Sequence, residues 1–285
     1  MQGSKIMDEA DVIEGTDQVL EDLGHTPSGP SWRPACPPLR RGCPMNLRPI
    51  VLTGHRVRLE PLAHSHAEEL LQAAAHDEIW TYLDKPTPRA PDDIKALITD
   101  ALREQENGTR LPFAIISTHT GQAVGSTSYI DVRPADRTVE IGWTWITPSQ
   151  WASGVNTEAT YLLLELAFEE HRVGRVAMKA DARNLRSQRA ITKIGAVREG
   201  VWRNHRLLST GHYRDSVYFS VIDSEWPSVR AGLQSRLTEA RDHSPRGLGE
   251  LSVRLQGGPQ TGPHAPSTPA AIPSGRVSRA RTNDS

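Results

Sequence analysis

Residues Ser149–Phe168 have the sequence SQWASGVNTEATYLLLELAF, in which a run of small, turn-forming residues leads directly into a strongly apolar segment. The apolar segment predicts a buried helix from about residue 156 to 170. N–H groups at the start of a helix lack partners within the helix, and the helix dipole adds partial positive charge there. Two interpretations remain open: Gly154 sets a turn and Asn156 caps the helix, or the loop backbone binds an anion such as a phosphate.

The strand that precedes this loop carries a carboxylate in its middle. Alternation along VEIGWTW predicts two faces, with Val139, Ile141, Trp143 and Trp145 on one and Glu140, Gly142 and Thr144 on the other. An acidic side chain beside a glycine is unusual where a strand face only packs, although an exposed strand face would also accept it. Glu140 is therefore a candidate site residue.

A third feature lies downstream, in NLRSQRAITKIG. Asn184 and Ser187 stand one helical turn apart, on one face and at the start of a predicted helix that Gly195 ends. The simpler interpretation is that Asn184 only caps this helix. Each of the three features is weak by itself, and their order along the chain is what gives them weight.

The rest of the pattern predicts a single α/β or α+β domain, because strands and helices are mixed without strict alternation. Ser65 is expected to cap the first helix, with Glu68 at capping-box spacing. A hairpin turn is expected at residues 119–121. Expected strands cover residues 55–62, 111–118, 123–130, 138–146, 175–181, 198–208 and 212–222, and expected helices cover 65–75, 91–105, 156–170, 184–195 and 224–240.

The two ends of the chain differ from its middle in composition. Residues 1–45 and 241–285 are rich in Pro, Gly, Ser and Arg and poor in periodic apolar positions, so both are expected to be disordered extensions of a domain at 46–240. Met45 directly precedes the predicted domain and is a candidate for the physiological start. The acidic N-terminus has no apolar signal core, and we expect a cytoplasmic protein.

The overall charge argues against two classes of partner. The formal net charge of the 285-residue chain is -1, which gives no general electrostatic reason to expect nucleic acid or a membrane surface as a partner. The 2 cysteines, Cys36 and Cys43, lack the further ligands of a zinc site, and no metal is expected.

Four segments, taken in order, resemble one known family: LTGHRVRLEPL, VEIGWTWITPSQWASGVNTEATYLLLELAFE, RVAMKADARNLRSQRAITKIGAVREGV and YRDSVYFSVIDSEWPSV. From about Val51 to Leu237 the chain resembles the GNAT N-acetyltransferase superfamily, especially its RimJ/RimL-like branch of ribosomal-protein N-terminal acetyltransferases. The resemblance implies the GNAT fold, a mixed central sheet of about six to seven strands flanked by helices. It also implies acetyl-CoA as the co-substrate.

The resemblance assigns the opening loop to the cofactor. In the family, this loop holds the pyrophosphate through backbone amides, with the pattern Gln/Arg-x-x-Gly-x-Gly/Ala. Gly154 is kept here, whereas Trp151 replaces the Gln/Arg and Asn156 replaces the last small residue, which weakens a side-chain role but not a backbone one. The strand end would pair with the pantetheine arm. The implied cofactor-binding residues are Trp145, Ile146, Trp151, Ala152, Ser153, Gly154, Val155, Asn156, Asn184 and Ser187.

The implied reaction is direct attack of an amine on the thioester in a ternary complex. Glu140 is the candidate general base, acting directly or through one water. The family often supplies a Tyr acid for the leaving thiolate, but Ile191 stands at that position here, so Ser187 is the candidate that orients or relays a proton to sulfur. The favoured acceptor is a protein N-terminal α-amino group, whose pKa of about 8 makes it easier to deprotonate than lysine.

The acceptor side is less defined by the sequence. Trp80 and Tyr82 lie where the family often builds the amine-side wall, and His205 and Arg214 could bind a peptide carbonyl or carboxylate. The alternatives are aromatic packing under a loop for the first pair, and salt bridges within the last hairpin for the second pair and their neighbours Arg206 and Asp215. Rival functions are acetylation of a small-molecule amine and non-catalytic acyl-CoA binding. A homodimer is possible.

Overall fold

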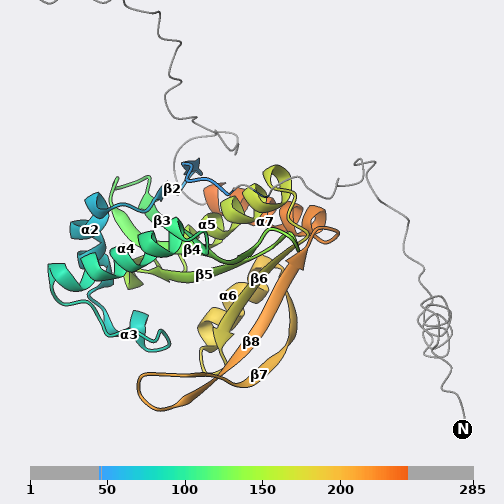
Figure 1. The fold of residues 1–285 in the computed structure, drawn as a ribbon. Coiled ribbons are helices and arrows are strands. Elements are labelled where there is room, and N and C mark those ends of the chain that lie inside the picture. Colours follow the sequence, from blue (N-terminus) through green and yellow to red (C-terminus); the bar gives the residue numbers. More distant parts are fainter. Residues whose placement is uncertain (1–44, 46, 243–285) are drawn as a thin grey trace, which may run out of the picture. The chain divides into compact units, whose positions relative to one another are not determined.

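The computed structural model describes Met45 and residues 47–242, and the two predicted terminal extensions lie almost entirely outside these residues. An eight-stranded sheet runs through the described part in the order β1-β2-β3-β4-β5-β6-β8-β7 (Figure 1). The mixed sheet flanked by helices is confirmed, and the strand beyond the expected six to seven is the two-residue β1. The strands are β1 Leu52–Thr53, β2 Val57–Pro61, β3 Arg110–Ser117, β4 Ala123–Arg133, β5 Thr138–Ile146, β6 Arg175–Asp181, β7 Val197–Leu207 and β8 Tyr213–Ile222.

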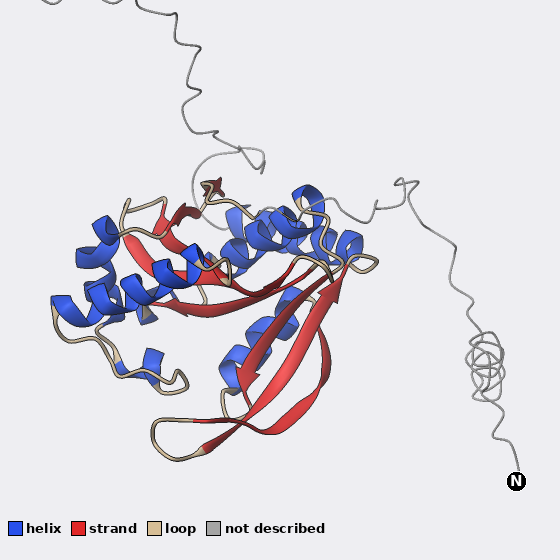
Figure 2. Cartoon of the chain, viewed as in Figure 1, coloured by secondary structure: helices blue, strands red, loops and turns tan. Residues whose placement is uncertain are grey.

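Helices cover the two faces of this sheet unequally (Figure 2). On one face, α2 (Ala67–Ala74) and α4 (Pro91–Glu106) pack over β3 and β4, and the short α3 (Asp77–Trp80) lies between them in sequence. The other face carries α5 (Val155–Glu165), its π-helical extension η3 (Leu166–Glu170), α6 (Leu185–Ile194) and α7 (Trp226–Asp242). The larger apolar core lies on this second face and includes Met45, which is 7% exposed.

One parallel pair interrupts an otherwise antiparallel sheet. β5 and β6 pair in parallel from Thr138 opposite Arg175 to Ile141 opposite Met178, and their pairing ends there although both strands continue. In Figure 1 the two strands diverge beyond this point, because β6 follows β8 and β7 away from β5. The split leaves the end of β5 with an edge that faces β6 without being bonded to it, at the place where the loop into α5 begins.

The predicted faces of β5 are wrong beyond Gly142. Ser126 pairs with Trp145 but Ser128 pairs with Gly142, so the single residue between them on β4 faces two residues of β5. This bulge is centred on Trp143, whose φ is 51°. The extra residue shifts the alternation, so Trp145 packs with the core under α2 and α4, whereas Val139 and Ile141 belong to the core under α5.

Two local predictions have different outcomes. The hairpin turn is confirmed, since Gly121 N donates to Ser117 O at 2.8 Å with the glycine at φ 73°. The Ser65 cap is wrong: a 3-10 turn, η1 (His64–His66), precedes α2, and the ring of His66 rather than Ser65 accepts the N–H of Ala63, at 3.1 Å. The histidine satisfies the helix start because its Nδ1 reaches back three residues.

A carboxylate in the first turn of α5 ties this helix to the sheet. Glu158 is 1% exposed and accepts the backbone N–H groups of His55, Arg56 and Val57, at 2.9, 2.5 and 2.9 Å. The neighbouring Gly54 is in close contact with it, since a Cβ there would stand 2.7 Å from Cδ of Glu158. Three charge-assisted bonds to one buried side chain thus fix the start of α5 against the β1–β2 turn.

Replacing Glu158 by glutamine is expected to lower the free energy of unfolding by about 3 kcal/mol, because the amide nitrogen would direct N–H donors at backbone N–H donors. Urea denaturation of the wild type and the variant measures this. Exposed Glu68 on α2 supplies the control, and Glu68→Gln should change stability by less than about 0.5 kcal/mol. Equal stability of all three proteins would show that the three hydrogen bonds to Glu158 contribute little to the free energy of unfolding.

Candidate functional site

The loop before α5 has the backbone geometry of a tight helix entry. Gly154 occupies the N-cap with φ 90°, and Ala152 also has a positive φ, of 61°. Ser153 Oγ donates to Gln150 O at 2.7 Å and accepts from Val155 N at 3.3 Å. The prediction that Asn156 caps the helix is wrong, because α5 starts one residue earlier and Asn156 lies inside its first turn. The turn therefore depends on Gly154.

Trp151 contacts both the end of β5 and the start of α6. Its Nε1 donates to Ile146 O at 2.9 Å, and its ring packs partly buried against the core under α2 and α4. The guanidinium carbon of Arg186, from the first turn of α6, lies 3.3 Å from the centroid of the Trp151 ring. This cation–π contact joins the end of β5 to the start of α6 across the split between β5 and β6.

Asn184 and Ser187 meet at the start of α6. Asn184 is the N-cap, and its Oδ1 accepts the N–H of Ser187 at 3.0 Å, so the capping interpretation is confirmed. Ser187 is half-buried, which leaves its side chain partly accessible. Ile146 and Val155 are 6% and 3% exposed, so only their backbone groups could meet a ligand.

Glu140 lies in a cavity of about 570 Å³ on the sheet face opposite α5, formed by β4, β5, β6, β8 and β7. The side chain is 5% exposed, and its Oε2 accepts from Lys179 Nζ at 2.9 Å. Its Oε1 is buried and has no hydrogen-bond partner among the described residues. Burial raises the pKa of the Glu140 carboxyl, and the adjacent Lys179 limits that rise.

An aromatic and imidazole group lines the same cavity. His205 Nδ1 lies 2.9 Å from Ser216 Oγ, and its Nε2 lies 3.2 Å from Tyr218 OH. Trp202 stacks on Tyr218 with ring centroids 4.3 Å apart. Burial, with lesser effects of Lys179 and two arginines, lowers the pKa of His205, and burial raises that of Tyr218 to about 12. His205 and Glu140 therefore share one cavity.

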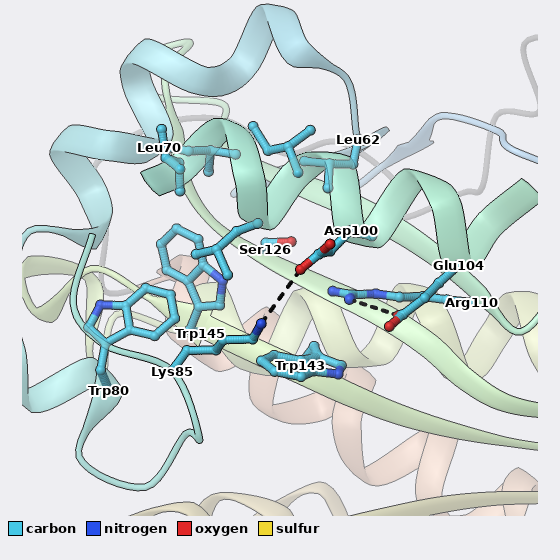
Figure 3. Close-up of a pocket in the computed structure, with 14 residues that line it drawn as sticks. Leu62, Leu70, Trp80, Lys85, Asp100, Glu104, Arg110, Ser126, Trp143 and Trp145 are labelled. Atoms are coloured by element: carbon cyan, nitrogen blue, oxygen red, sulfur yellow. Dashed lines mark hydrogen bonds and ion pairs between the residues drawn. The ribbon is translucent and has the colours of Figure 1, made fainter. Parts of the chain in front are cut away.

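A second, smaller cavity of about 60 Å³ lies beneath α4 (Figure 3). Trp80, Trp143 and Trp145 wall it, with ring centroids of Trp80 and Trp145 5.6 Å apart. Two ion pairs line it, Lys85 with Asp100 at 3.5 Å and Arg110 with Glu104 at 3.2 Å. Trp80 is 4% exposed and donates to Ala74 O at 2.8 Å, so it packs in the core as well as lining this cavity.

The remaining acceptor-side candidates, Tyr82 and Arg214, do not line the larger cavity. Tyr82 lines neither cavity, and the guanidinium carbon of Arg183 lies 5.9 Å from its ring centroid. The alternative of salt bridges within the last hairpin is wrong. Arg206 pairs with Asp84 at 3.7 Å and Arg214 with Asp181 at 4.0 Å, both outside the hairpin, and Asp215 accepts Asn204 N at 2.7 Å.

Sequence reasoning missed several side chains that define this site. Lys179 and Tyr218 could have been found by alternation, because each shares a face with another polar residue two positions away on its strand. Arg186 and Trp143 carry no such signal, since a cation–π contact between distant segments and a bulge depend on tertiary structure. Among the described residues, no cluster of three or more His, Cys, Asp or Glu could hold a metal ion.

None of the helices in the described part of the chain has the length and apolar character needed to cross a membrane.

Comparison with known proteins identifies the family of this chain. The family "Acetyltransferase (GNAT) domain" matches residues 56–197. "Putative ribosomal N-acetyltransferase YdaF" of Bacillus subtilis (strain 168) is 28% identical over 169 residues, which cover 59% of this chain and 90% of that protein. A crystal structure of a putative acetyltransferase from T. thermophilus is 40% identical, covers 67% of this chain and 98% of its own, and has a TM-score of 0.61.

A likeness in fold extends to a ligand-bound structure. Mycobacterium smegmatis RimJ in complex with CoA-disulfide has a TM-score of 0.58 and 21% identity, over 66% of this chain and 95% of that one. This likeness shows that the two chains share a fold. The chain belongs to the GNAT family and is an N-acetyltransferase.

Replacing Gly154 by alanine should lower the free energy of unfolding by about 1 to 2 kcal/mol, because an L residue is strained at a φ of 90°. The cost would come from the backbone, since the added Cβ would meet Arg56 Cδ at an ordinary 3.5 Å. Gly232, exposed within α7, is the matched control, and its replacement by alanine should stabilise by about 0.5 to 1 kcal/mol. Scanning calorimetry of the wild type and the two variants measures both changes in stability. Equal losses of stability at Gly154 and Gly232 would contradict the argument that Gly154 is required by its positive φ.

Proposed function

We propose that this protein transfers the acetyl group of acetyl-CoA to the α-amino group of a protein N-terminus, by direct attack in a ternary complex. The observation that carries the proposal is the split between β5 and β6, with a buried carboxylate on one side of the sheet and a tight helix entry at its end. The name of YdaF, which refers to a ribosomal N-acetyltransferase, supports this class of acceptor.

The residues around the split fit the cofactor. The start of α5 offers backbone N–H groups and partial positive charge to the pyrophosphate, and Gly154 lets a phosphate approach the backbone closely. The edge of β5 from Gly142 to Ile146 can pair with the amides of the pantetheine arm. We propose that Ala152, Ser153 and Asn156 lie around the phosphate and that Trp145 and Trp151, which pack partly buried against the core under α2 and α4, also contact the cofactor. The acetyl thioester supplied by the bound cofactor is the electrophile.

Glu140 fits the role of general base. Its unpartnered Oε1 can accept a proton from the attacking amine, directly or through one water, while its Oε2 holds Lys179. Burial raises the pKa of the Glu140 carboxyl toward that of an amine, which favours proton transfer, and Lys179 limits the rise. Ser187, half-buried at the start of α6, is proposed to orient the leaving thiolate. A thiolate with a pKa of about 8.5 needs little acid assistance.

The acceptor is proposed to enter the larger cavity, which His205 and the exposed Trp202 line. Arg214, Trp80 and Tyr82 do not line this cavity, and their proposed contacts with the acceptor lie outside it. A small-molecule amine is the second candidate, and a non-catalytic acyl-CoA-binding role is the third. We also propose a cytoplasmic location. Light scattering would show whether the protein forms a homodimer.

Calorimetric titration of acetyl-CoA into the full chain tests the first step. Saturable binding is expected, with weaker binding of dephospho-CoA and none of ATP at the same concentration. Wild-type protein is then assayed for thiol release with N-terminal peptides and with small amines. Binding without turnover of any amine would favour the non-catalytic role, and turnover of small amines alone would replace the peptide acceptor.

Glu140→Gln is expected to lower kcat at least about 100-fold while the Kd for acetyl-CoA changes less than about 2-fold, because the residue acts on the amine rather than on the cofactor. Single-turnover assays and calorimetry measure the two quantities. The exposed Glu239, far along α7, provides a Glu→Gln control that should leave both unchanged. A Glu140→Gln variant with undiminished kcat would remove Glu140 from the mechanism.

Lys179→Met is expected to shift the acidic limb of the kcat/KM profile to higher pH. Lys179 lowers the pKa of Glu140 by charge and by a hydrogen bond, so its loss lets the burial effect raise that pKa further. A base must be deprotonated to act, and activity then appears only at higher pH. An unchanged limb would mean that another group titrates there.

A further inference from the structure

Two arginines face each other beside the turn of the β7–β8 hairpin. Arg206 and Arg214 are directly opposed in the register of the two strands. Like charges in this position destabilise a sheet unless something between or beside them carries the opposite charge. The two side chains differ in environment, since Arg206 is 51% exposed and Arg214 only 11%.

The buried Arg214 lacks a full set of partners. Its Nε is buried without a hydrogen-bond partner among the described residues. The carboxylate nearest to it, Asp181 Oδ2, is 4.0 Å away, beyond hydrogen-bond distance. A buried guanidinium with an unused donor carries a desolvation cost that a bound anion would offset.

Asp181 offsets this cost only by its charge, because its hydrogen bonds go to Arg183. The two oxygens of Asp181 accept the backbone N–H, Nε and Nη2 of Arg183, at 2.8, 3.0 and 2.7 Å. The other nearby acid, Asp84, accepts Ser209 N at 2.8 Å and pairs with Arg206. Arg183 and Arg206 are therefore the closer cationic partners of these two carboxylates, and neither carboxylate forms a hydrogen bond with Arg214 Nε.

Arg214 lies on the acceptor side of the sheet. Arg214, Ser216 and Tyr218 are spaced by two along β8 and so share one face of the strand, and Tyr218 lines the cavity that contains Glu140. The start of α5, where the cofactor phosphates are proposed to bind, is on the side of Val217 and Phe219, which belong to the core under α5. An anion that meets Arg214 therefore comes with the acceptor rather than with the cofactor.

We propose that Arg214 binds a carboxylate carried by the acceptor, so that the preferred substrate is a peptide with Asp or Glu close to its N-terminal amine. The inference deepens the proposed function and rests on it. A guanidinium presents a planar set of donors that matches a carboxylate in two-point contact. Glu140 and Arg214 then act on different groups of one acceptor, its amine and its side-chain anion.

A matched pair of peptides tests this preference. Peptides that differ only by Asp or Asn at the second position are compared by kcat/KM in the thiol-release assay. The wild type should prefer the Asp peptide at least about 10-fold, as expected for a hydrogen bond between charged groups. In Arg214→Gln the ratio of the two kcat/KM values should fall to about 1, and Arg214→Lys should retain part of it.

Arg203 provides the control on the same hairpin, because it is exposed on β7. Arg203→Gln should keep the wild-type ratio. Equal rates on the two peptides in the wild type would overturn the proposal while leaving the acetyltransferase intact. A preference that persists in Arg214→Gln would also overturn it.

A dicarboxylate that has no amine tests binding at the anion site independently of catalysis. Glutarate alone should raise the melting temperature of the wild type and of Arg203→Gln, and should have no effect on Arg214→Gln. If no peptide is acetylated, this measurement still decides whether the anion site exists. Loss of acetyl-CoA binding in Arg214→Gln, with no change for dephospho-CoA, would instead assign the arginine to the cofactor's 3′-phosphate.

Discussion

The site depends on the three hydrogen bonds that Glu158 accepts from the backbone of residues 55–57. These bonds hold the first turn of α5 against the β1–β2 turn, and the loop with Gly154 stands directly before that turn of helix. A loop that uses backbone groups to bind a ligand needs its helix fixed in place, because the N–H groups have no side-chain freedom with which to adjust. The carboxylate that builds the fold here also positions the loop.

The split between β5 and β6 then divides the chemistry between two faces. The α5 face provides helix dipole and backbone donors, which suit phosphates, whereas the opposite face provides Glu140, Lys179 and the β7–β8 hairpin. The charged groups near Glu140 and Asp181 on the face opposite α5 are nearly all paired, as buried charges must be. The exceptions, Glu140 Oε1 and Arg214 Nε, are therefore informative, since each leaves one atom for a ligand.

Much of this architecture follows from the sequence, because alternation and helical periodicity record burial directly. The strands from residue 111 to 222, the helix after Gly154 and the cap at Asn184 were all within reach of such patterns. The bulge at Trp143 could not be predicted in this way. One extra residue moves every later side chain of β5 to the opposite face of the sheet, and nothing in the composition marks it. The Ser65 and Asn156 caps failed because residue type sets only a preference for a helix start, and tertiary contacts moved each start. The pairing of Arg183 rather than Arg214 with Asp181 likewise depends on geometry.

The parallel pairing of β5 with β6 also has a kinetic meaning. The two strands meet only after the intervening α5 and η3 have crossed the sheet, whereas β3 to β5 and β7 to β8 can form through local hairpins. Loop closure over this separation makes the seam between the two halves of the sheet a late event in folding. The seam is also the natural boundary between two units of local opening. A molecule that binds in the seam and contacts both halves of the sheet would therefore stabilise them against local opening, and amide hydrogen exchange would slow in both halves.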